Sequence, residues 1–218
     1  MHGENIQAYG LWILVIINAA LFVFFIFSFL MPMKKREWRS MGVTTAFFVA
    51  LFTEMYGFPL TIYLLTGLLG NKYPALDPFS HANGHLWVTF FGGDVLAMNV
   101  IHVVSNGMVL FGFFIMWKGW KLVHSGSGEL VTSGLYGYTR HPQYTGLFIV
   151  IVGMFIQWPS IATVIMAPVL VTVYYRLSRR EEKEMIEYFG DKYREYMSRT
   201  PMFLPRFGQL CSSGKTNN

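Results

Sequence analysis

Long hydrophobic runs separated by short polar stretches dominate this chain. Three runs, at residues 9–31, 44–69 and 95–117, are each long enough to cross about 30 Å of hydrocarbon as a helix. Two shorter runs, at residues 144–158 and 161–175, flank Pro159 and Ser160. A break of that kind predicts a tight helical hairpin. The pattern therefore predicts an all-α, polytopic membrane protein with about five transmembrane helices, the last two of which form the hairpin.

The pattern changes beyond residue 176, where apolar and charged positions alternate. Between residues 177 and 197 the apolar positions follow helical spacing, which is typical of amphipathic helices outside the bilayer. Gly190 and Asp191 are expected to end one helix and begin the next, and Thr200 and Pro201 to end the second. Residues 208–218 carry few hydrophobic residues and are expected to be a disordered tail.

Basic residues follow the hydrophobic runs in a consistent way. Only 13% of the residues are charged, against about 25% in soluble domains. The net charge of +5 therefore reflects membrane topology and gives no support to nucleic-acid binding. Because basic clusters mark cytoplasmic loops, we expect the N-terminus outside and the C-terminus in the cytoplasm. The clusters are Lys34, Lys35, Arg36 and Arg39; Lys118 and Lys121; and Arg176, Arg179 and Arg180.

Glu54 is a carboxylate within the second hydrophobic run, and Pro59 follows it closely enough to bend that helix. A charge in a span is costly, so Glu54 should face protein or water. Two interpretations stay open for it. Glu54 is either a structural partner of polar residues in the third run, namely Asn99, His102 or Asn106, or a catalytic residue that contacts a substrate or acts as a general base.

Metal and soluble-enzyme chemistry find little support in the sequence. Cys211 is the one cysteine, so neither a disulfide nor a cysteine-based metal site can form within the chain. His81 and His85 have the spacing of helical metal ligands, but Gly84 disfavours a helix and no third ligand is evident. We therefore expect no metal site. The chain also lacks a glycine-rich turn after a strand, which excludes a soluble dinucleotide-type fold.

Arg140-His141-Pro142 and Glu181-Glu182 are expected to meet, because the hairpin returns the chain to the membrane face that it left. Taken separately, they could be interfacial anchors and a solvated helix face. Brought together, their opposite charges suit a zwitterionic ligand. Tyrosines with an apolar ring and a polar tip could form the walls of such a site; they are Tyr136, Tyr138, Tyr144, Tyr193 and Tyr196.

The order of these motifs resembles a known family. It reads Gly134-x-Tyr136, Arg140-His141-Pro142-x-Tyr144-x-Gly146, the hairpin, Arg180-Glu181-Glu182, Phe189-Gly190-x-x-Tyr193-x-x-Tyr196, then Pro201 and Pro205. This is similar to the isoprenylcysteine carboxyl methyltransferases and the related phospholipid methyltransferases, over residues 120–207. Residues 51–59 differ from the eukaryotic prenylcysteine enzymes and resemble prokaryotic members of the wider family.

The resemblance implies S-adenosylmethionine as cofactor, in a cytosol-facing pocket closed by the C-terminal helices, and a lipid-like acceptor that enters from the bilayer. It implies that Arg140 is a catalytic residue that fixes the pocket or the acceptor. The cofactor-binding residues carried over are Tyr136, His141, Pro142, Tyr144, Glu181, Glu182 and Tyr193. The chain then divides into three membrane helices with an outer loop at 71–95 (residues 1–119), a cofactor-binding region (120–207) and the tail (208–218).

The expected function is a membrane methyltransferase that acts on an apolar or amphiphilic acceptor, like the isoprenylcysteine carboxyl O-methyltransferases. A phospholipid N-methyltransferase and a small-thiol S-methyltransferase remain alternatives, because the sequence does not identify the acceptor. A membrane scaffold, or a transporter subunit with Glu54 on an ion path, is the alternative from outside enzymology. The sequence gives no indication of oligomeric state.

Overall fold

The computed structural model describes residues 10–30, 38–69, 85–87, 94–124 and 129–205, and in these residues every regular element is a helix. The N-terminal region contributes α1 (Trp12–Phe29), α2 (Trp38–Phe52), the short π-helix η1 (Thr53–Gly57) and α3 (Leu60–Leu69). The long helix α5 (Val95–His124) follows. The C-terminal region contributes α6 (Leu135–Tyr138), α7 (Pro142–Gln157), α8 (Ile161–Phe189) and α9 (Asp191–Arg199). The predicted all-α fold is confirmed.

The predicted bend in the second hydrophobic run lies at Pro59. Phe58 adopts an extended conformation, as a residue before proline prefers, and the α2–η1 segment meets α3 at an angle of 66°. Glu54 lies on η1 with 5% of its surface exposed, so it faces protein as expected. Its partners differ from the expected ones: Glu54 accepts hydrogen bonds from the backbone N–H and the hydroxyl of Thr61, at 3.0 and 2.9 Å.

Helices α7 and α8 form the predicted hairpin around Trp158, Pro159 and Ser160. The Ser160 side chain accepts a hydrogen bond from the Thr163 N–H, and the Thr163 hydroxyl accepts one from the Ser160 N–H. This capping box fixes the start of α8 at the turn. The sequence predicted a membrane segment ending near residue 175 and a separate helix after it. Instead, α8 continues without a break to Phe189, because no glycine or proline interrupts residues 169–189.

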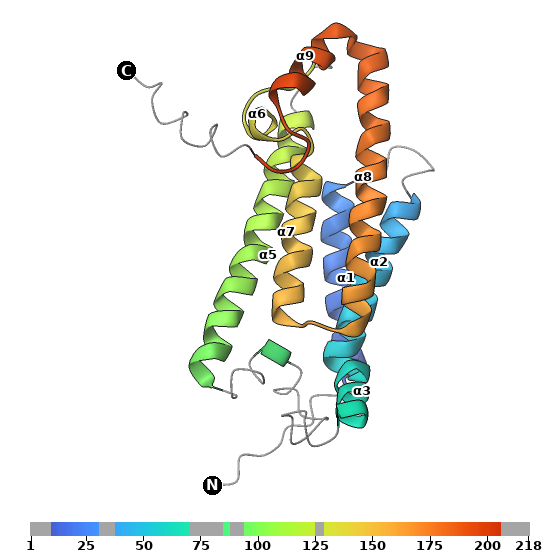
Figure 1. Ribbon diagram of the computed structural model, residues 1–218, viewed down its shortest axis with the longest axis vertical. Helices are drawn as coiled ribbons and strands as arrows, with labels where there is room; N and C mark the ends of the chain where they lie inside the picture. The colour runs from blue at the N-terminus through green and yellow to red at the C-terminus, as the bar shows by residue number, and fades with distance from the viewer. Residues whose placement is uncertain (1–9, 31–37, 70–84, 88–93, 125–128, 206–218) are drawn as a thin grey trace.

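Within the described residues, fewer helices than expected are long and apolar enough to span a membrane. Helices α1, α5 and α8 are long and apolar enough to cross a membrane, and the bent pair formed by residues 40–57 and α3 adds a fourth span if it is counted as one. Helix α7 has 16 residues, which is short for a span, although it runs along α5 in Figure 1. The prediction of about five transmembrane helices is therefore not confirmed.

Two close helix contacts build the bundle. Helices α5 and α7 touch through Gly112 and Gly146, where a Cβ atom added to either glycine would lie 2.6 Å from the carbonyl oxygen of the other. Helix α2 packs on α8, where the Thr44 and Tyr174 hydroxyls lie 2.7 Å apart. Aromatic side chains, among them Phe22, Phe48 and Phe113, fill the space between α1, α2 and α5.

Polar helices gather at one end of this bundle. Figure 1 shows α6, α9 and the C-terminal part of α8 at that end, and α3 with the α7–α8 turn at the other. Gly190 ends α8 and precedes α9 with φ +60°, a conformation that glycine adopts readily, and α9 ends before Thr200. Both boundaries were predicted. The division of the chain at residue 119 stays a prediction, although α5 continues to His124, and residues 206–218 lie outside the described part.

Candidate functional site

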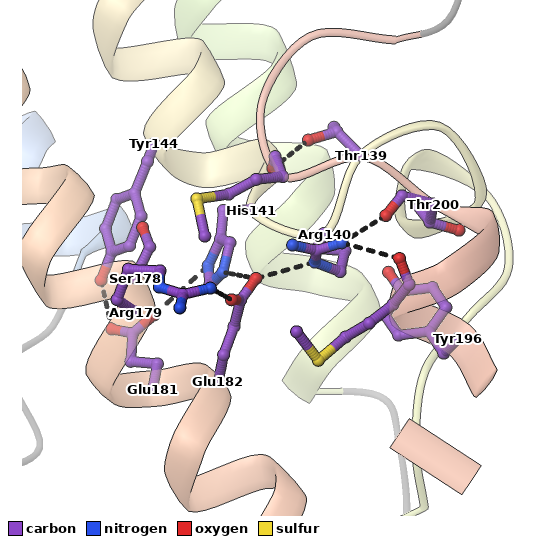
Figure 2. A network of polar contacts seen from close by, with 12 residues as sticks. Thr139, Arg140, His141, Tyr144, Ser178, Arg179, Glu181, Glu182, Tyr196 and Thr200 are labelled. Atoms are coloured by element: carbon purple, nitrogen blue, oxygen red, sulfur yellow. Dashed lines mark hydrogen bonds and ion pairs between the residues drawn. The ribbon is translucent and has the colours of Figure 1, made fainter. Parts of the chain in front are cut away.

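A buried ion pair between α7 and α8 forms the centre of the candidate site (Figure 2). The Arg140 Nε lies 2.7 Å from the Glu182 Oε1, and the two side chains are only 10% and 2% exposed. Arg179, which is mostly exposed, approaches the other oxygen of Glu182 at 3.7 Å. The predicted meeting of the arginine–histidine motif with the acidic pair, across 42 positions of sequence, is confirmed.

The local sequence explains why Arg140 and His141 face α8. Gly134 has φ +62°, so the chain turns sharply before the short helix α6. Thr139 is extended after α6, and His141 is the N-cap residue of α7. Pro142 occupies the first turn of α7, where its fixed φ suits a helix start and its missing N–H costs nothing. Arg140 and His141 are thereby fixed in the short connection beside the end of α8.

His141 contacts both members of the acidic pair. Its Nδ1 lies 3.3 Å from Glu181 Oε2, and its Nε2 lies 3.4 Å from Glu182 Oε1. Burial alone would lower the pKa of His141, but the two carboxylates outweigh it and raise the pKa above its ordinary value. Tyr144 stacks on the His141 ring at 5.6 Å and donates its hydroxyl hydrogen to Glu181. The two carboxylates therefore favour the protonated form of His141.

The segment after α9, residues 201–203, forms a strap over the loop that carries His141, and no motif in the sequence predicts it. The backbone N–H groups of Arg140 and His141 donate to the carbonyls of Pro201 and Met202, at 2.9 and 3.1 Å. The Arg140 Nη1 donates to the Met197 carbonyl at 3.0 Å, near the end of α9. Phe203 packs against the His141 ring at 5.9 Å. These are mainly backbone contacts, so no side-chain pattern could reveal them.

Tyr136 and Tyr193 line the α9 side of the network. The Tyr136 carbonyl accepts a 2.6 Å hydrogen bond from Tyr196, and Tyr193 contacts the Tyr196 ring edge-on at 5.7 Å. Burial, and then the negative charge of Glu182, raises the pKa of Tyr193 to about 12. Burial also raises the pKa of Tyr136 well above its usual value. Both phenols therefore stay neutral and keep a hydrogen to donate.

A cavity of about 710 Å³ lies beside the network and shares Tyr196 and Thr200 with it. None of the predicted cofactor residues lines this cavity. Two buried atoms of the network, His141 Nε2 and Glu182 Oε2, have charged neighbours at 3.4 and 3.7 Å but form no hydrogen bond. Because such atoms are costly when left unpaired, they point to a ligand at the network more directly than the cavity does. The remaining lining residues are Glu129, Leu130, Thr132, Gly137, Phe189, Lys192, Glu195 and Arg199.

Glu54 is not brought to this site. Thr61, its partner, also accepts a hydrogen bond from the N–H of Ile161, the first residue of α8. Glu181 lies 20 residues further along the same helix, which corresponds to roughly 30 Å at 1.5 Å per residue. The expected partners in the third run are not those observed, because the bend at Pro59 exposes the free N–H groups of the first turn of α3 to Glu54.

No metal centre is found within the described ranges, where no group of three or more histidine, cysteine, aspartate or glutamate side chains could hold an ion. His85 is described, and its Nδ1 lies 3.0 Å from the Gln157 carbonyl oxygen. His81, the other histidine of the pair with metal-ligand spacing, lies outside the described residues.

The charge on His141 should make the protein's stability depend on pH. Because the folded-state pKa is raised, the stabilisation is fully present below the unfolded value, about 6.5, and is lost as the pH rises through the folded value. We expect the thermal unfolding midpoint of the detergent-solubilised protein to decrease as the pH rises from about 6 to about 9. We expect this decrease to be smaller in His141→Gln. His124→Gln, on the exposed end of α5, is the control. An unchanged decrease in His141→Gln would contradict this role.

Comparisons with known proteins agree with the motif order. The family described as phospholipid methyltransferase matches residues 87–192. Protein-S-isoprenylcysteine O-methyltransferase of Homo sapiens is 36% identical over 169 residues, which cover 66% of this chain and 59% of that protein. The Schizosaccharomyces pombe protein of the same name is 34% identical over 77 residues, 35% of this chain and 33% of that protein.

A third relative carries a different name. Methanethiol S-methyltransferase of Crocosphaera subtropica is 35% identical over 81 residues, which cover 36% of this chain and 30% of that protein. The chain thus spans less than two thirds of the length of each of these curated relatives. Its apolar helices and these relatives together indicate an integral membrane protein. The resemblance in the motifs is confirmed: residues 87–192 match the phospholipid methyltransferase family, and the chain is similar to the isoprenylcysteine O-methyltransferases.

Proposed function

We propose that this chain is an integral membrane methyltransferase that uses S-adenosylmethionine and transfers its methyl group to an amphiphilic acceptor. The observation that carries the proposal is the buried network of Arg140, His141, Glu181 and Glu182 where α7 begins and α8 leaves the apolar region. A charged cluster of this kind is expensive at the edge of a membrane bundle. Binding of a polar, zwitterionic ligand would account for such a cluster at this position.

The side chains present fit this cofactor. When bound, S-adenosylmethionine supplies a methyl group on a positively charged sulfur. Glu181 is 31% exposed and offers a carboxylate to ligand hydroxyl or ammonium groups. Glu182 Oε2 and His141 Nε2 are buried and lack hydrogen-bond partners, so both can bind a ligand. Tyr136, Pro142, Tyr144 and Tyr193 would form the walls; the neutral tyrosines can face a sulfonium without carrying a competing charge.

Arg140 is better assigned as a positioning residue than as a catalytic one. Its guanidinium is engaged by Glu182, by the Met197 carbonyl and by the Thr200 carbonyl. It therefore holds the carboxylate and the end of α9 in place, and would not itself touch the acceptor. Methyl transfer is an in-line displacement, so fixing the reacting groups is the main demand on the protein.

The engagement of both carboxylates also bears on the acceptor. Glu181 receives the Tyr144 hydroxyl and faces His141, while Glu182 pairs with Arg140. Neither is placed as a free general base, and Glu54 is roughly 30 Å away by helix rise. An acceptor that arrives already deprotonated, such as a carboxylate or a thiolate, needs no base. We therefore favour an isoprenylcysteine-type carboxylate over a phospholipid amine, with a small thiol as the second candidate.

The proposed topology places the site in the cytoplasm and the N-terminus outside. Basic residues lie close to the network on two helices: Lys118 and Lys121 flank Gly119 of α5, which packs against Pro142, and Arg176, Arg179 and Arg180 precede Glu181 on α8. An excess of lysine and arginine marks the cytoplasmic side of membrane proteins. A lipid-like acceptor would then reach the network from the inner leaflet.

The first test is calorimetry of the purified, folded protein with S-adenosylhomocysteine. We expect binding, and a loss of at least about tenfold in Glu181→Gln, since a hydrogen bond to a charged group contributes about 1.5–3 kcal/mol. Transfer of labelled methyl from S-adenosylmethionine is then measured with N-acetyl-S-farnesylcysteine, phosphatidylethanolamine vesicles and methanethiol. A base-labile product identifies a methyl ester. Folded protein that binds no S-adenosylhomocysteine would refute the enzyme and favour a scaffold or transporter subunit.

A further inference from the structure

Polar side chains continue from the network into the apolar part of α8. Tyr174, Ser178 and Glu182 follow one another at intervals of four residues, so they share one face of the helix. All three are almost completely buried, at 1%, 0% and 2% exposure. The Ser178 hydroxyl donates to the Tyr174 carbonyl at 2.9 Å. The inward face of α8 is therefore a buried polar stripe that leads away from the acidic pair.

The stripe crosses to α2 through the Tyr174 hydroxyl. That hydroxyl lies 2.7 Å from the Thr44 hydroxyl, which in turn bonds to the Ser40 carbonyl at 3.0 Å. When the Thr44 hydroxyl hydrogen is on that carbonyl, Tyr174 is the donor to Thr44; the Tyr174 hydroxyl also lies 3.9 Å from the Met41 sulfur. Thr44 is 1% exposed and lies outside residues 87–192, which the family matches. The N-terminal region thus reaches toward the site.

Tyr144 connects the polar stripe to Glu181 of the acidic pair. Its ring packs on the Tyr174 ring at 5.1 Å, and its hydroxyl donates to Glu181. Phe148 meets the Tyr174 ring edge-on at 6.3 Å and packs against Phe203 of the strap. Residues from α2, α7 and α8 therefore form one continuous line of contacts from Thr44 through Tyr174 and Tyr144 to Glu181.

The position of this line suits an acceptor that comes from the bilayer. The strap of residues 201–203 covers His141 with backbone hydrogen bonds, so approach from that side is obstructed. Tyr174 precedes Glu181 by seven residues, about 10 Å along α8 toward the apolar part. An amphiphile whose apolar part stays in the bilayer would reach Glu181 past Tyr144, which the buried Tyr174 ring supports from inside the bundle.

Packing alone does not require the hydroxyl groups of Tyr174 and Thr44. Phenylalanine and valine would fill nearly the same volumes as Tyr174 and Thr44, and burying hydroxyl groups is costly unless they are paired. Within lipid, an interhelical hydrogen bond of this kind also adds only modestly to stability. A role in orienting the tyrosine rings accounts for the pair better than helix association does.

We propose that Thr44 and Tyr174 are positioning residues for the methyl acceptor: their hydrogen bond fixes the buried Tyr174 ring, which packs on Tyr144 and so holds in place the side chain that an amphiphilic acceptor would meet beside Glu181. This inference rests on the proposed methyltransferase function. It assigns the acceptor side of the site to α2 and the inward face of α8, and the cofactor side to the His141 loop and the acidic pair. The N-terminal membrane region would then contribute to acceptor selection.

The test compares near-isosteric variants with matched neighbours. Tyr174→Phe is paired with Tyr175→Phe, which alters an exposed tyrosine on the same helix, and Thr44→Val with Thr172→Val, whose hydroxyl bonds only locally to Pro168. Labelled methyl transfer is titrated with N-acetyl-S-farnesylcysteine and with solubilised total membrane extract of the expression host. S-adenosylhomocysteine affinity and the unfolding midpoint are measured alongside.

We expect Tyr174→Phe and Thr44→Val each to raise the half-saturating acceptor concentration about three- to tenfold, the range of one hydrogen bond. Cofactor affinity should change less than about twofold, and the double variant should resemble either single one because they share one bond. Equal effects in the Tyr175→Phe control, a parallel loss of cofactor affinity, or additive losses would overturn the inference alone. A wild-type protein that transfers no methyl group to any probe would instead refute the proposed function, and this inference with it.

Discussion

Glu182→Gln is expected to lower the free energy of unfolding by about 3–5 kcal/mol and to abolish S-adenosylhomocysteine binding. The substitution leaves the Arg140 guanidinium, which is only 10% exposed, without its carboxylate, and uncompensated buried charges cost that much. It also removes a charged partner of His141 and alters Glu182 Oε2, the buried oxygen that we propose binds the ligand. Denaturant unfolding of the solubilised protein and calorimetry measure the two effects.

Glu187→Gln is the matched control, because Glu187 is an exposed glutamate on the same helix; we expect it to change stability by less than about 0.5 kcal/mol. A second comparison separates stability from binding. In Arg140→Met/Glu182→Leu both charges are gone, so stability should recover in part relative to Glu182→Gln, while ligand binding stays absent. If Glu182→Gln were as stable as Glu187→Gln, the buried pair would not hold this end of the bundle together.

The meeting of Arg140 and Glu182 could be predicted because it depends on features that a sequence displays. Pro159 marks a break, and the hydrophobic runs before and after it have equal lengths, so the second helix must return to the level where the first began. Helical rise then brings residues of α8 near 180 beside the start of α7. The identity of the meeting residues follows from geometry that is nearly independent of side-chain packing.

The partner of Glu54 and the strap could not be predicted in the same way. Glu54 binds Thr61, seven residues away, because the bend at Pro59 leaves free N–H groups at the start of α3. A threonine two residues after the proline was the available signal, whereas the expected partners were polar residues of the next span. The strap bonds through the carbonyls of Pro201 and Met202, and backbone groups carry no sequence signature. The continuity of α8 to Phe189 was not predicted, because the sequence changes from apolar to charged near residue 176, and a change in polarity does not by itself end a helix.

Gly146→Ala is expected to separate α5 from α7 and to destabilise the protein by about 1–3 kcal/mol or more. A Cβ atom at position 146 would lie 2.6 Å from the Gly112 carbonyl oxygen and 3.1 Å from the Met116 backbone nitrogen. Backbone atoms cannot rotate away as a side chain can, so the helices themselves must move. Because Pro142 starts α7 one turn earlier, the displacement should also shift His141 and weaken S-adenosylhomocysteine binding.

The reciprocal change and a control make the prediction specific. Gly112→Ala places a Cβ atom 2.6 Å from the Gly146 carbonyl oxygen, so it should cost a similar amount, and the double variant should cost less than the sum because the helices separate only once. Gly107→Ala, on the same helix with nothing within 4 Å of the added atom, should instead stabilise by about 0.5–1 kcal/mol, since alanine favours a helix over glycine. Unfolding midpoints that rise for all three single variants would show that α5 and α7 do not pack backbone against backbone at Gly112 and Gly146.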